Sequence, residues 1–405
     1  MTPEHELLKR LAIVNDSKIV LLVLDGVGDL RTGVQPATAL GLACTPNLDA
    51  LAARGSNGRL IPVAPGITPG SGPGHLALFG YDPRLPQHDI GRGVLEALGL
   101  GAEFDGDDVL ARGNFATADA AGNLTDRRAG RISSETCRSL CAAINQSLEA
   151  KGSPASVIAG EGHRFVLRLR GNGLSPLVAE TDPQRIGVPA IQAEFLAPEA
   201  EATASLVANF VDLAEQTIQN HPKANRVLLR GFSQRPQLTS LSDIFSARFG
   251  AFAGYPLYRG VAAACGMTDV PASKQCRNLF ADVAAAWDRF DFFFLHIKQT
   301  DQAGEDGDLA AKIEVIEEVD RCLPDLMKLA PDVIAITADH STPAPMHAHS
   351  WHPVPLLIAG ENAFVDEVAS FDENSSIQGH LGLLPATNLM GLLFAHAGRL
   401  AKFGA

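Results

Sequence analysis

The sequence predicts an α/β protein in which helices cover both faces of a core sheet. Three short apolar segments support this prediction, and each ends in an acidic residue: KIVLLVLDGVGD (18–29), FDFFFLHIKQTD (290–301) and DVIAITADHSTP (332–343). Continuous apolar runs of this length are typical of strands that are buried on both faces. In open α/β sheets, ligands bind at the carboxyl ends of the strands, so we expect the acidic residues to mark a site.

Helical segments separate these strands. In CTPNLDALAARG (44–55), Thr45 is a candidate N-cap, Pro46 occupies the first helical position and Gly55 stops the helix. Residues 309–330 repeat their apolar positions with the helical period, and VPLLIAG (354–360) predicts a further short strand. The alternation of strands and helices supports the α/β assignment.

The middle of the chain has a different pattern, which predicts an inserted, smaller α+β domain. Residues 111–245 contain shorter alternating runs such as HRFVLRLRG (163–171), several Gly, Asn and Pro turns, and a helix near 199–219. We therefore expect a core built from residues 1–110 and 246–405, with a substrate-binding insert between the two parts.

Composition excludes several classes of protein. The chain has 405 residues, of which 46% are hydrophobic and 20% are charged, as in globular proteins with a large core. The net charge of −13 argues against a general nucleic-acid or anionic-membrane binder. Six scattered cysteines without a CxxC pair predict buried free thiols and no disulfide framework. The charged amino terminus does not resemble a signal peptide and residues 19–24 are too short to span a bilayer, so we expect a cytoplasmic protein.

Seven residues form a candidate metal-ligand set. Carboxylate and imidazole donors of this kind suit Mn²⁺, Mg²⁺ or Zn²⁺. Each one alone has an ordinary explanation, since an acid after a strand often caps a helix and a histidine loop can simply be solvated. Together, seven donors from converging strand ends suffice for two metal ions: Asp25, Asp301, Glu305, Asp339, His340, His349 and His352.

Ser71 lies in TPGSGPGHLALFGYDP (68–83). A serine between glycines and prolines is ordinarily a turn residue. Here it also begins a helix, whose free N–H groups and dipole favour an anion. A coordinated metal would lower the pKa of the hydroxyl and make Ser71 a nucleophile.

Arginines form a third group. TDRRAGRIS (125–133) contains Arg127, Arg128 and Arg131, and GRGVLEALG (91–99) adds Arg92. Such a run is often a solvated face, but arginine also binds phosphate and carboxylate through two parallel hydrogen bonds. In a chain with this net negative charge, the cluster favours an anion site.

The motifs together resemble the archaeal-type 2,3-bisphosphoglycerate-independent phosphoglycerate mutases of the alkaline phosphatase superfamily. The resemblance runs from about residue 18 to about residue 395 and rests on LVLDGVGD, TPNLDALAARG, TPGSGPGHLALFGYDP, GRGVLEALG, NFAT…DRRAGRI, HIKQTD…GEDGD and TADHSTP…HSWHPVP. It implies an alkaline-phosphatase-like core sheet, a phosphoglycerate substrate and no 2,3-bisphosphoglycerate. It also implies two divalent metals, with Mn²⁺ first and Mg²⁺, Zn²⁺ or Co²⁺ as alternatives.

The resemblance also implies roles for individual residues. Asp25, Ser71, Asp339 and His340 would surround one metal, and Asp301, residue 305 and His349 the other. Ser71 would accept the phosphoryl group, Arg92 and Arg131 would assist catalysis, and Arg127 and Arg128 would bind substrate. Two positions depart from the family pattern, because Glu305 stands where the family has histidine and His352 where HSxDPVP has aspartate. Both residue types ligate metals, so Glu305 and His352 remain candidate ligands.

The implied reaction interconverts 3-phosphoglycerate and 2-phosphoglycerate through a phosphoserine. Two alternatives stay open: a metal-dependent phosphomonoesterase or phosphotransferase of the same superfamily, and a metal-binding protein without catalytic activity.

Overall fold

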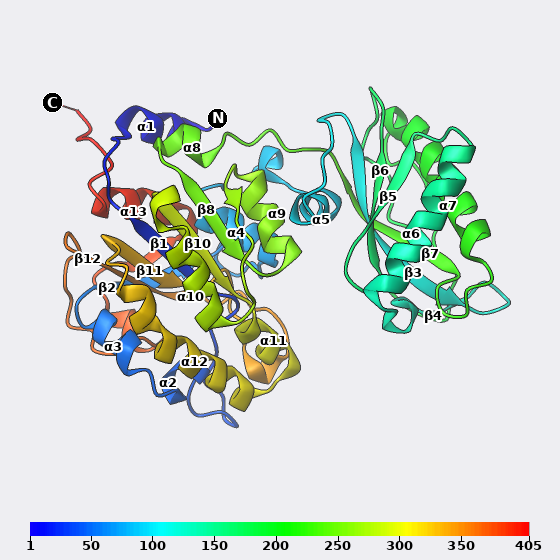
Figure 1. The fold of residues 1–405 in the computed structure, drawn as a ribbon. Helices are drawn as coiled ribbons and strands as arrows, with labels where there is room; N and C mark the ends of the chain where they lie inside the picture. Colours follow the sequence, from blue (N-terminus) through cyan, green and yellow to red (C-terminus); the bar gives the residue numbers. More distant parts are fainter. Residues whose placement is uncertain (405) are drawn as a thin grey trace. The chain divides into compact units, whose positions relative to one another are not determined.

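The computed structural model describes residues 1–404 and divides into two compact units (Figure 1). Unit 1 comprises Met1–Asp89 and Gln237–Ala405, and unit 2 comprises Ile90–Pro236. Among the described residues, no helix is long and apolar enough to cross a membrane.

Unit 1 is built on an eight-stranded sheet. Its strand order is β13-β2-β12-β11-β1-β10-β8-β9. The bounds are β1 Ile19–Leu24, β2 Ser56–Ile61, β8 Phe249–Ala253, β9 Thr268–Asp269, β10 Phe292–Ile297, β11 Val333–Thr337, β12 Val354–Gly360 and β13 Gly382–Pro385. β1 lies between β10 and β11 and pairs with both in parallel. The three apolar segments that end in acids are therefore neighbouring central strands, as the sequence predicted.

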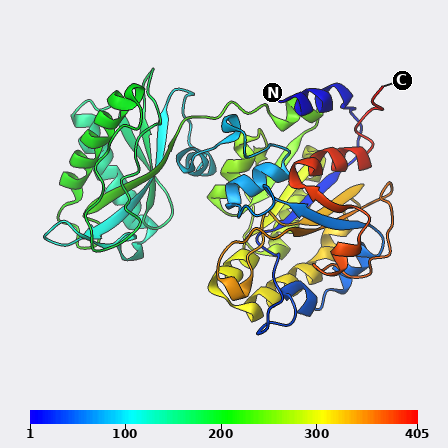
Figure 2. The same ribbon diagram turned by 180° about the vertical axis from the view of Figure 1, so that it is seen from behind.

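Burial explains why these strands occupy the centre. Every residue of β1, β10 and β11 is buried, so no position alternates toward solvent. Helices cover both faces, with α3, α10 and α12 on one and α4, α9 and α13 on the other (Figures 1 and 2). The helices of unit 1 are α1 Pro3–Leu11, α2 Ala39–Leu42, α3 Pro46–Ala52, α4 Ser71–Leu78, α8 Leu241–Phe245, α9 Pro256–Ala264, α10 Cys276–Ala285, α11 Gln299–Asp306, α12 Leu309–Met327 and α13 Leu389–His396. The predicted α/β class with helices on both faces is confirmed.

Helix α3 begins where the sequence predicted, but the side chain that caps it comes from another helix. Thr45 is the N-cap residue, yet its side chain makes no capping hydrogen bond. Instead Asp320 of α12 accepts from the backbone N–H groups of Asn47 at 2.9 Å and Leu48 at 2.8 Å. A carboxylate at a helix N-terminus satisfies otherwise unpaired donors and favours the helix dipole.

Unit 2 is a sheet covered by two long helices. The order β4-β3-β6-β5, with β7 also paired to β3, joins five antiparallel strands. The bounds are β3 Val109–Ala118, β4 Leu124–Asp126, β5 Ala155–Ala159, β6 Arg164–Leu169 and β7 Arg226–Ser233, with α5 Arg92–Gly99, α6 Ser134–Ala150 and α7 Glu201–Ile218. The unit begins at residue 90, ahead of the expected boundary at 111, because α5 packs on β3 and β7.

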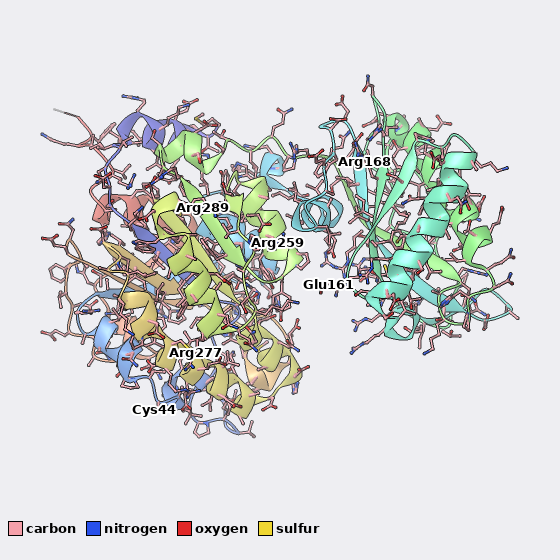
Figure 3. All side chains as sticks on the ribbon, in the orientation of Figure 1. Cys44, Glu161, Arg168, Arg259, Arg277 and Arg289 are labelled. Atoms are coloured by element: carbon pink, nitrogen blue, oxygen red, sulfur yellow. The ribbon has the colours of Figure 1, made fainter. Side chains whose placement is uncertain are left out.

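The cysteines are all free, and five of the six are buried. The prediction of buried thiols is wrong for Cys44, which is exposed between α2 and α3 (Figure 3).

Candidate active site

Three buried carboxylates meet at the carboxyl edge of the unit 1 sheet. Asp25 follows β1 directly, Asp301 lies in the first turn of α11 after β10, and Asp339 follows β11. All three side chains are fully buried. The parallel pairing of β1 with β10 and β11 brings them to one edge, because parallel strands end on the same side.

Asp25, Asp339 and His340 form the first group of candidate metal ligands. His340 Nε2 lies 3.3 Å from Asp25 Oδ1 and 3.2 Å from Asp339 Oδ2. Among the described residues, these same three atoms are buried without a hydrogen-bond partner. Unpaired buried polar atoms are costly, so three that converge favour the binding of a cation between them.

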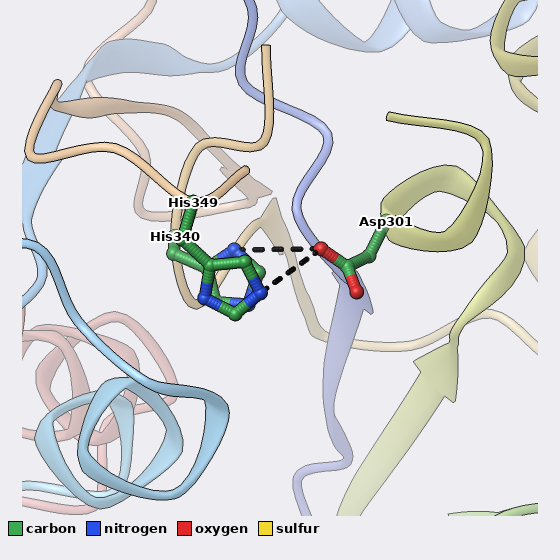
Figure 4. A group of neighbouring side chains, drawn as sticks. All are labelled: Asp301, His340 and His349. Atoms are coloured by element: carbon green, nitrogen blue, oxygen red, sulfur yellow. Dashed lines mark ion pairs between the residues drawn. The ribbon is translucent and has the colours of Figure 1, made fainter. Parts of the chain in front are cut away.

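Asp301, His340 and His349 form the second group (Figure 4). Asp301 Oδ1 lies 3.4 Å from His349 Nε2 and 3.8 Å from His340 Nδ1. The two imidazole rings stack with their centroids 3.6 Å apart. His340 therefore belongs to both groups, whereas the resemblance assigns it to the first metal alone.

The hydrogen bonds of Thr342 indicate which ring nitrogen of His340 carries a proton. Thr342 Oγ1 donates its single proton to Asp301 Oδ1 at 2.5 Å, so it accepts from His340 Nδ1 at 3.0 Å. In the neutral ring with its proton on Nδ1, His340 Nε2 would direct its lone pair toward Asp25 and Asp339. His349 is oriented in the same way, because its Nδ1 donates to the carbonyl of Pro69 at 3.0 Å. Imidazoles held through one nitrogen present the other to a metal.

Asp25 and Asp301 stay ionised although they are buried. Burial acts to raise the pKa of Asp25, but the hydrogen bond from His296 and the charge of Lys298 outweigh it and hold the pKa well below its usual range. Burial likewise opposes ionisation of Asp301, yet His349 and Lys298 lower its pKa to about 2. Lys298 Nζ contacts Asp301 and lies 3.4 Å from Asp25 Oδ2. His296 and Lys298 were not among the site residues predicted from the sequence, although each lies in HIKQTD beside Asp301.

Cation binding at the second group should tighten as pH rises from 7 to 9. Burial acts to lower the pKa of His349, but its hydrogen bonds to Asp301 and Pro69 raise it to about 9. At pH 7 the free ring carries a proton on Nε2 that a metal must displace. We expect the apparent affinity to rise about tenfold per pH unit below pH 9 and then to level off. Calorimetric titration with Mn²⁺ under nitrogen would measure this, and a flat profile would contradict it.

Ser71 is the first residue of α4, as predicted, and lies beside the first group. His75, one turn later, donates from Nδ1 to the Ser71 carbonyl at 2.8 Å and lies 3.1 Å from Asp339 Oδ2. The Tyr258 hydroxyl contacts the side chains of both Ser71 and Asp25, and burial raises the pKa of Tyr258 well above its usual range. The first turn of α4 is thus anchored directly to the carboxylate group.

Gly74 allows α4 to approach the Asp339 loop. A Cβ at this position would contact the Asp339 carbonyl oxygen closer than any real side chain does. Although alanine favours helices, we expect Gly74→Ala to destabilise the fold by about 1–3 kcal/mol through overpacking. Gly391→Ala in α13 is the matched control, since its Cβ would meet only a leucine methyl at 3.7 Å. Urea denaturation measures both, and a Gly74→Ala chain as stable as Gly391→Ala would contradict this packing argument.

The two positions that depart from the family pattern differ in their surroundings. Glu305 lies on α11, one turn after Asp301, with Oε1 3.7 Å from His349 Nε2 and a half-exposed side chain. The structure does not bring His352 to either group, because its Nδ1 faces Ser350 Oγ at 3.1 Å and its ring stacks on Trp351. In HSWHP, His349 turns inward and His352 does not.

Unit 2 contains a separate cationic cavity of about 160 Å³. Three of the arginines singled out from the sequence line it: Arg92, Arg127 and Arg128. Arg131 is exposed, does not line it, and sits in a turn at φ 51°. Arg127 is held by a bidentate pair with buried Asp182, at 2.7 and 2.6 Å.

Five lining residues were missed: Arg112, Asn114, His163, Arg164 and Arg230. Burial and the neighbouring Arg164 lower the pKa of Arg112 to about 10, and burial with nearby arginines lowers that of His163 to about 4. Cations that repel one another in this way favour a bound anion. Arg164 lies in the alternating pattern of β6. A local sequence pattern cannot predict, however, that this arginine shares a cavity with residues that are distant in the chain.

The donors of unit 1 fit divalent cations. Carboxylate oxygens and neutral imidazole nitrogens are the ligands that Mn²⁺ and Zn²⁺ take. Three of the converging atoms have no hydrogen-bond partner among the described residues. Unit 1 therefore contains a candidate divalent-metal site.

Comparison with known proteins gives the family. Residues 52–224 match a family model described as 2,3-bisphosphoglycerate-independent phosphoglycerate mutase. A probable mutase of that description from Thermotoga neapolitana is 44% identical over 100% of both chains, and one from Thermus thermophilus is 44% identical over 98% of both.

Solved structures agree. A protein of Pyrococcus horikoshii is 28% identical with a TM-score of 0.83, covering 97% of this chain and 100% of its own. A cofactor-independent phosphoglycerate mutase from Thermoplasma acidophilum is 28% identical with a TM-score of 0.69, covering 94% of this chain and 100% of its own. The chain therefore belongs to the 2,3-bisphosphoglycerate-independent phosphoglycerate mutase family and is an enzyme of the mutase class.

Proposed function

We propose that the enzyme interconverts 3-phosphoglycerate and 2-phosphoglycerate through a phosphoserine at Ser71, beside two divalent metals in unit 1. The observation that carries the proposal is the convergence of buried, unpaired Asp25, Asp339 and His340 atoms next to the first turn of α4. Membership of the mutase family supports the interconversion of the two phosphoglycerates. The position of Ser71 beside the metal-ligand groups supports transfer of the phosphoryl group through this serine.

One metal would be held by Asp25, Asp339 and His340, with Ser71, and the other by Asp301, His349 and Glu305. Mn²⁺ is the first candidate for both sites. When bound, such ions lower the pKa of a hydroxyl and neutralise charge on a transferring phosphoryl group. His352 is left out of this assignment because its ring faces Ser350 and Trp351.

Ser71 performs the transfer in two steps. Its Oγ gives up its proton and forms a bond to phosphorus while the phosphorus–oxygen bond to the glycerate breaks, and the released glycerate oxygen takes up a proton. The other hydroxyl of the same bound glycerate then loses its proton and attacks the phosphoserine, the phosphorus–Oγ bond breaks, and Ser71 Oγ takes a proton back. The N–H groups at the start of α4 face the phosphoryl oxygens in both steps.

The arginine cavity of unit 2 has the chemistry to bind an anion, and Arg127 and Arg128 are its candidate substrate-binding groups. Arg92, Arg127 and Arg128 line it, and Asp182 orients the Arg127 guanidinium. Guanidinium groups match carboxylate and phosphate oxygens in pairs. Arg131, which lies outside this cavity, stays a candidate catalytic group from the resemblance alone.

The test is turnover of 3-phosphoglycerate with Mn²⁺ and without 2,3-bisphosphoglycerate, coupled to enolase. We expect formation of 2-phosphoglycerate that stops when EDTA is added. Release of inorganic phosphate without 2-phosphoglycerate would favour the phosphomonoesterase alternative. No turnover with any divalent metal would overturn the proposal.

A further inference from the structure

Lys312 is a fully buried lysine beneath the metal-ligand loops. It lies on α12 with 0% of its surface exposed. Its ammonium donates to three backbone carbonyls, of Gly26 at 3.0 Å, Gly28 at 3.2 Å and Thr342 at 2.8 Å. A lysine ammonium has three N–H donors, so all of them are used.

The three carbonyls belong to two loops that carry metal ligands. Gly26 and Gly28 follow Asp25, and Thr342 follows Asp339 and His340. The loops also contact each other directly, since the Thr342 N–H faces the carbonyls of Gly26 at 3.2 Å and Gly28 at 3.0 Å. The Gly26 N–H donates in turn to Asp339 Oδ1 at 3.3 Å. Lys312 therefore binds at the junction of the two loops without touching a ligand atom.

Both loops need the close approach that this junction provides. A Cβ at Gly26 would come within 2.7 Å of Asp301 Oδ1, and one at Gly28 would contact Ser341. From the same junction, Thr342 Oγ1 bonds Asp301 and His340. A shift of Thr342 would thus displace ligands of both metal groups.

Lys312 is also a buried cation beside acidic groups. Asp29 and Glu373 act most strongly on its ammonium, and Asp301 of the metal-ligand groups acts on it less strongly. A side chain without donors would remove one hydrogen bond from each of the three carbonyls, and only those of Gly26 and Gly28 would keep the Thr342 N–H as a donor. A buried carbonyl that loses its donor costs more than a missing surface hydrogen bond.

We propose that Lys312 is a positioning residue that holds the Asp25–Gly28 loop against the Asp339–Thr342 loop and thereby determines how tightly the enzyme binds its metals. This inference rests on the metal sites of the proposed function. It adds a residue that neither ligates metal nor contacts substrate.

The first test is metal binding by Lys312→Met, which keeps the length of the side chain and removes its charge and donors. Mn²⁺ is titrated into the full chain and free Mn²⁺ is followed by electron paramagnetic resonance. We expect affinity to fall by at least about tenfold, the scale of lost outer-shell support for metal ligands. Lys18→Met is the matched control, because Lys18 Nζ also donates to a carbonyl, of Phe290 at 2.6 Å, but at the amino end of the sheet. It should leave affinity unchanged.

A folded Lys312→Met chain that binds Mn²⁺ like the wild type would overturn this inference and leave the proposed function standing. A wild-type chain that binds no Mn²⁺ would overturn both. Hydrogen exchange on metal-free wild type decides the case in which Lys312→Met does not fold. We expect the Thr342 amide to be protected before any metal binds, and exchange as fast as in an unstructured chain would overturn the inference.

Discussion

Ser71→Ala should lower mutase turnover by about 10⁴-fold or more, the scale seen when an enzyme loses its nucleophile. The expected loss is in kcat, because alanine removes the oxygen that we propose as the phosphoryl acceptor while the backbone N–H groups of α4 stay in place. The coupled assay with 3-phosphoglycerate and Mn²⁺ measures it. Brief incubation with radiolabelled substrate should also label the wild-type chain and not the variant.

Thr68→Ala is the matched control for this loss. Thr68 is an exposed hydroxyl residue three positions earlier in the same loop, so its removal tests whether any hydroxyl deletion there is harmful. We expect near wild-type turnover from Thr68→Ala. Turnover by Ser71→Ala within tenfold of wild type would exclude a phosphoserine at this position.

Asp301→Asn should weaken metal binding by at least about 100-fold, because loss of outer-shell support alone costs about 10–100-fold. The Asp301 carboxylate pairs with Lys298 and His349 and accepts a hydrogen bond from Thr342. Its pKa of about 2 keeps it charged at neutral pH. Asparagine keeps the shape but removes the charge. It also lets the pKa of His349 fall, since the bond to Asp301 contributes to raising it. Calorimetric titration with Mn²⁺ would measure the loss.

Asp306→Asn provides the comparison on the same helix. Asp306 is an exposed carboxylate at the end of α11, so its neutralisation removes an equal charge without touching the site. We expect its Mn²⁺ affinity to match the wild type. Equal weakening by both variants would mean that Asp301 acts only through the general negative charge of unit 1.

The departures from the family pattern show how far a local motif can be trusted. Glu305 and His352 looked like a reciprocal exchange of carboxylate and imidazole. Spacing supports Glu305, because residues four apart on a helix share a face, and its carboxylate does lie near His349. His352 lies in an irregular segment without such periodicity, so only the structure could show that its ring stacks on Trp351 and faces Ser350.

Local patterns predicted the central strands, the start of α4 and the convergence of the acids, because burial on both faces and helix-start signals are properties of short segments. Other features depended on contacts between segments far apart in the chain. Asp320 caps α3, and Asp182 holds Arg127. The arginines that share the cavity with Arg127 include Arg112, Arg164 and Arg230.

Local patterns in the chain predicted the fold class and most of the candidate metal donors, and the motifs resembled the family that the comparisons showed. Which donors share a group, and that His340 belongs to both groups, followed only from the folded structure. The folded structure also decided that Lys298, Tyr258, His75 and Lys312 support these donors. The physical reason is that a donor's chemistry is a property of one residue, whereas its partner, its proton and its charge state depend on neighbours that only folding brings within hydrogen-bond distance.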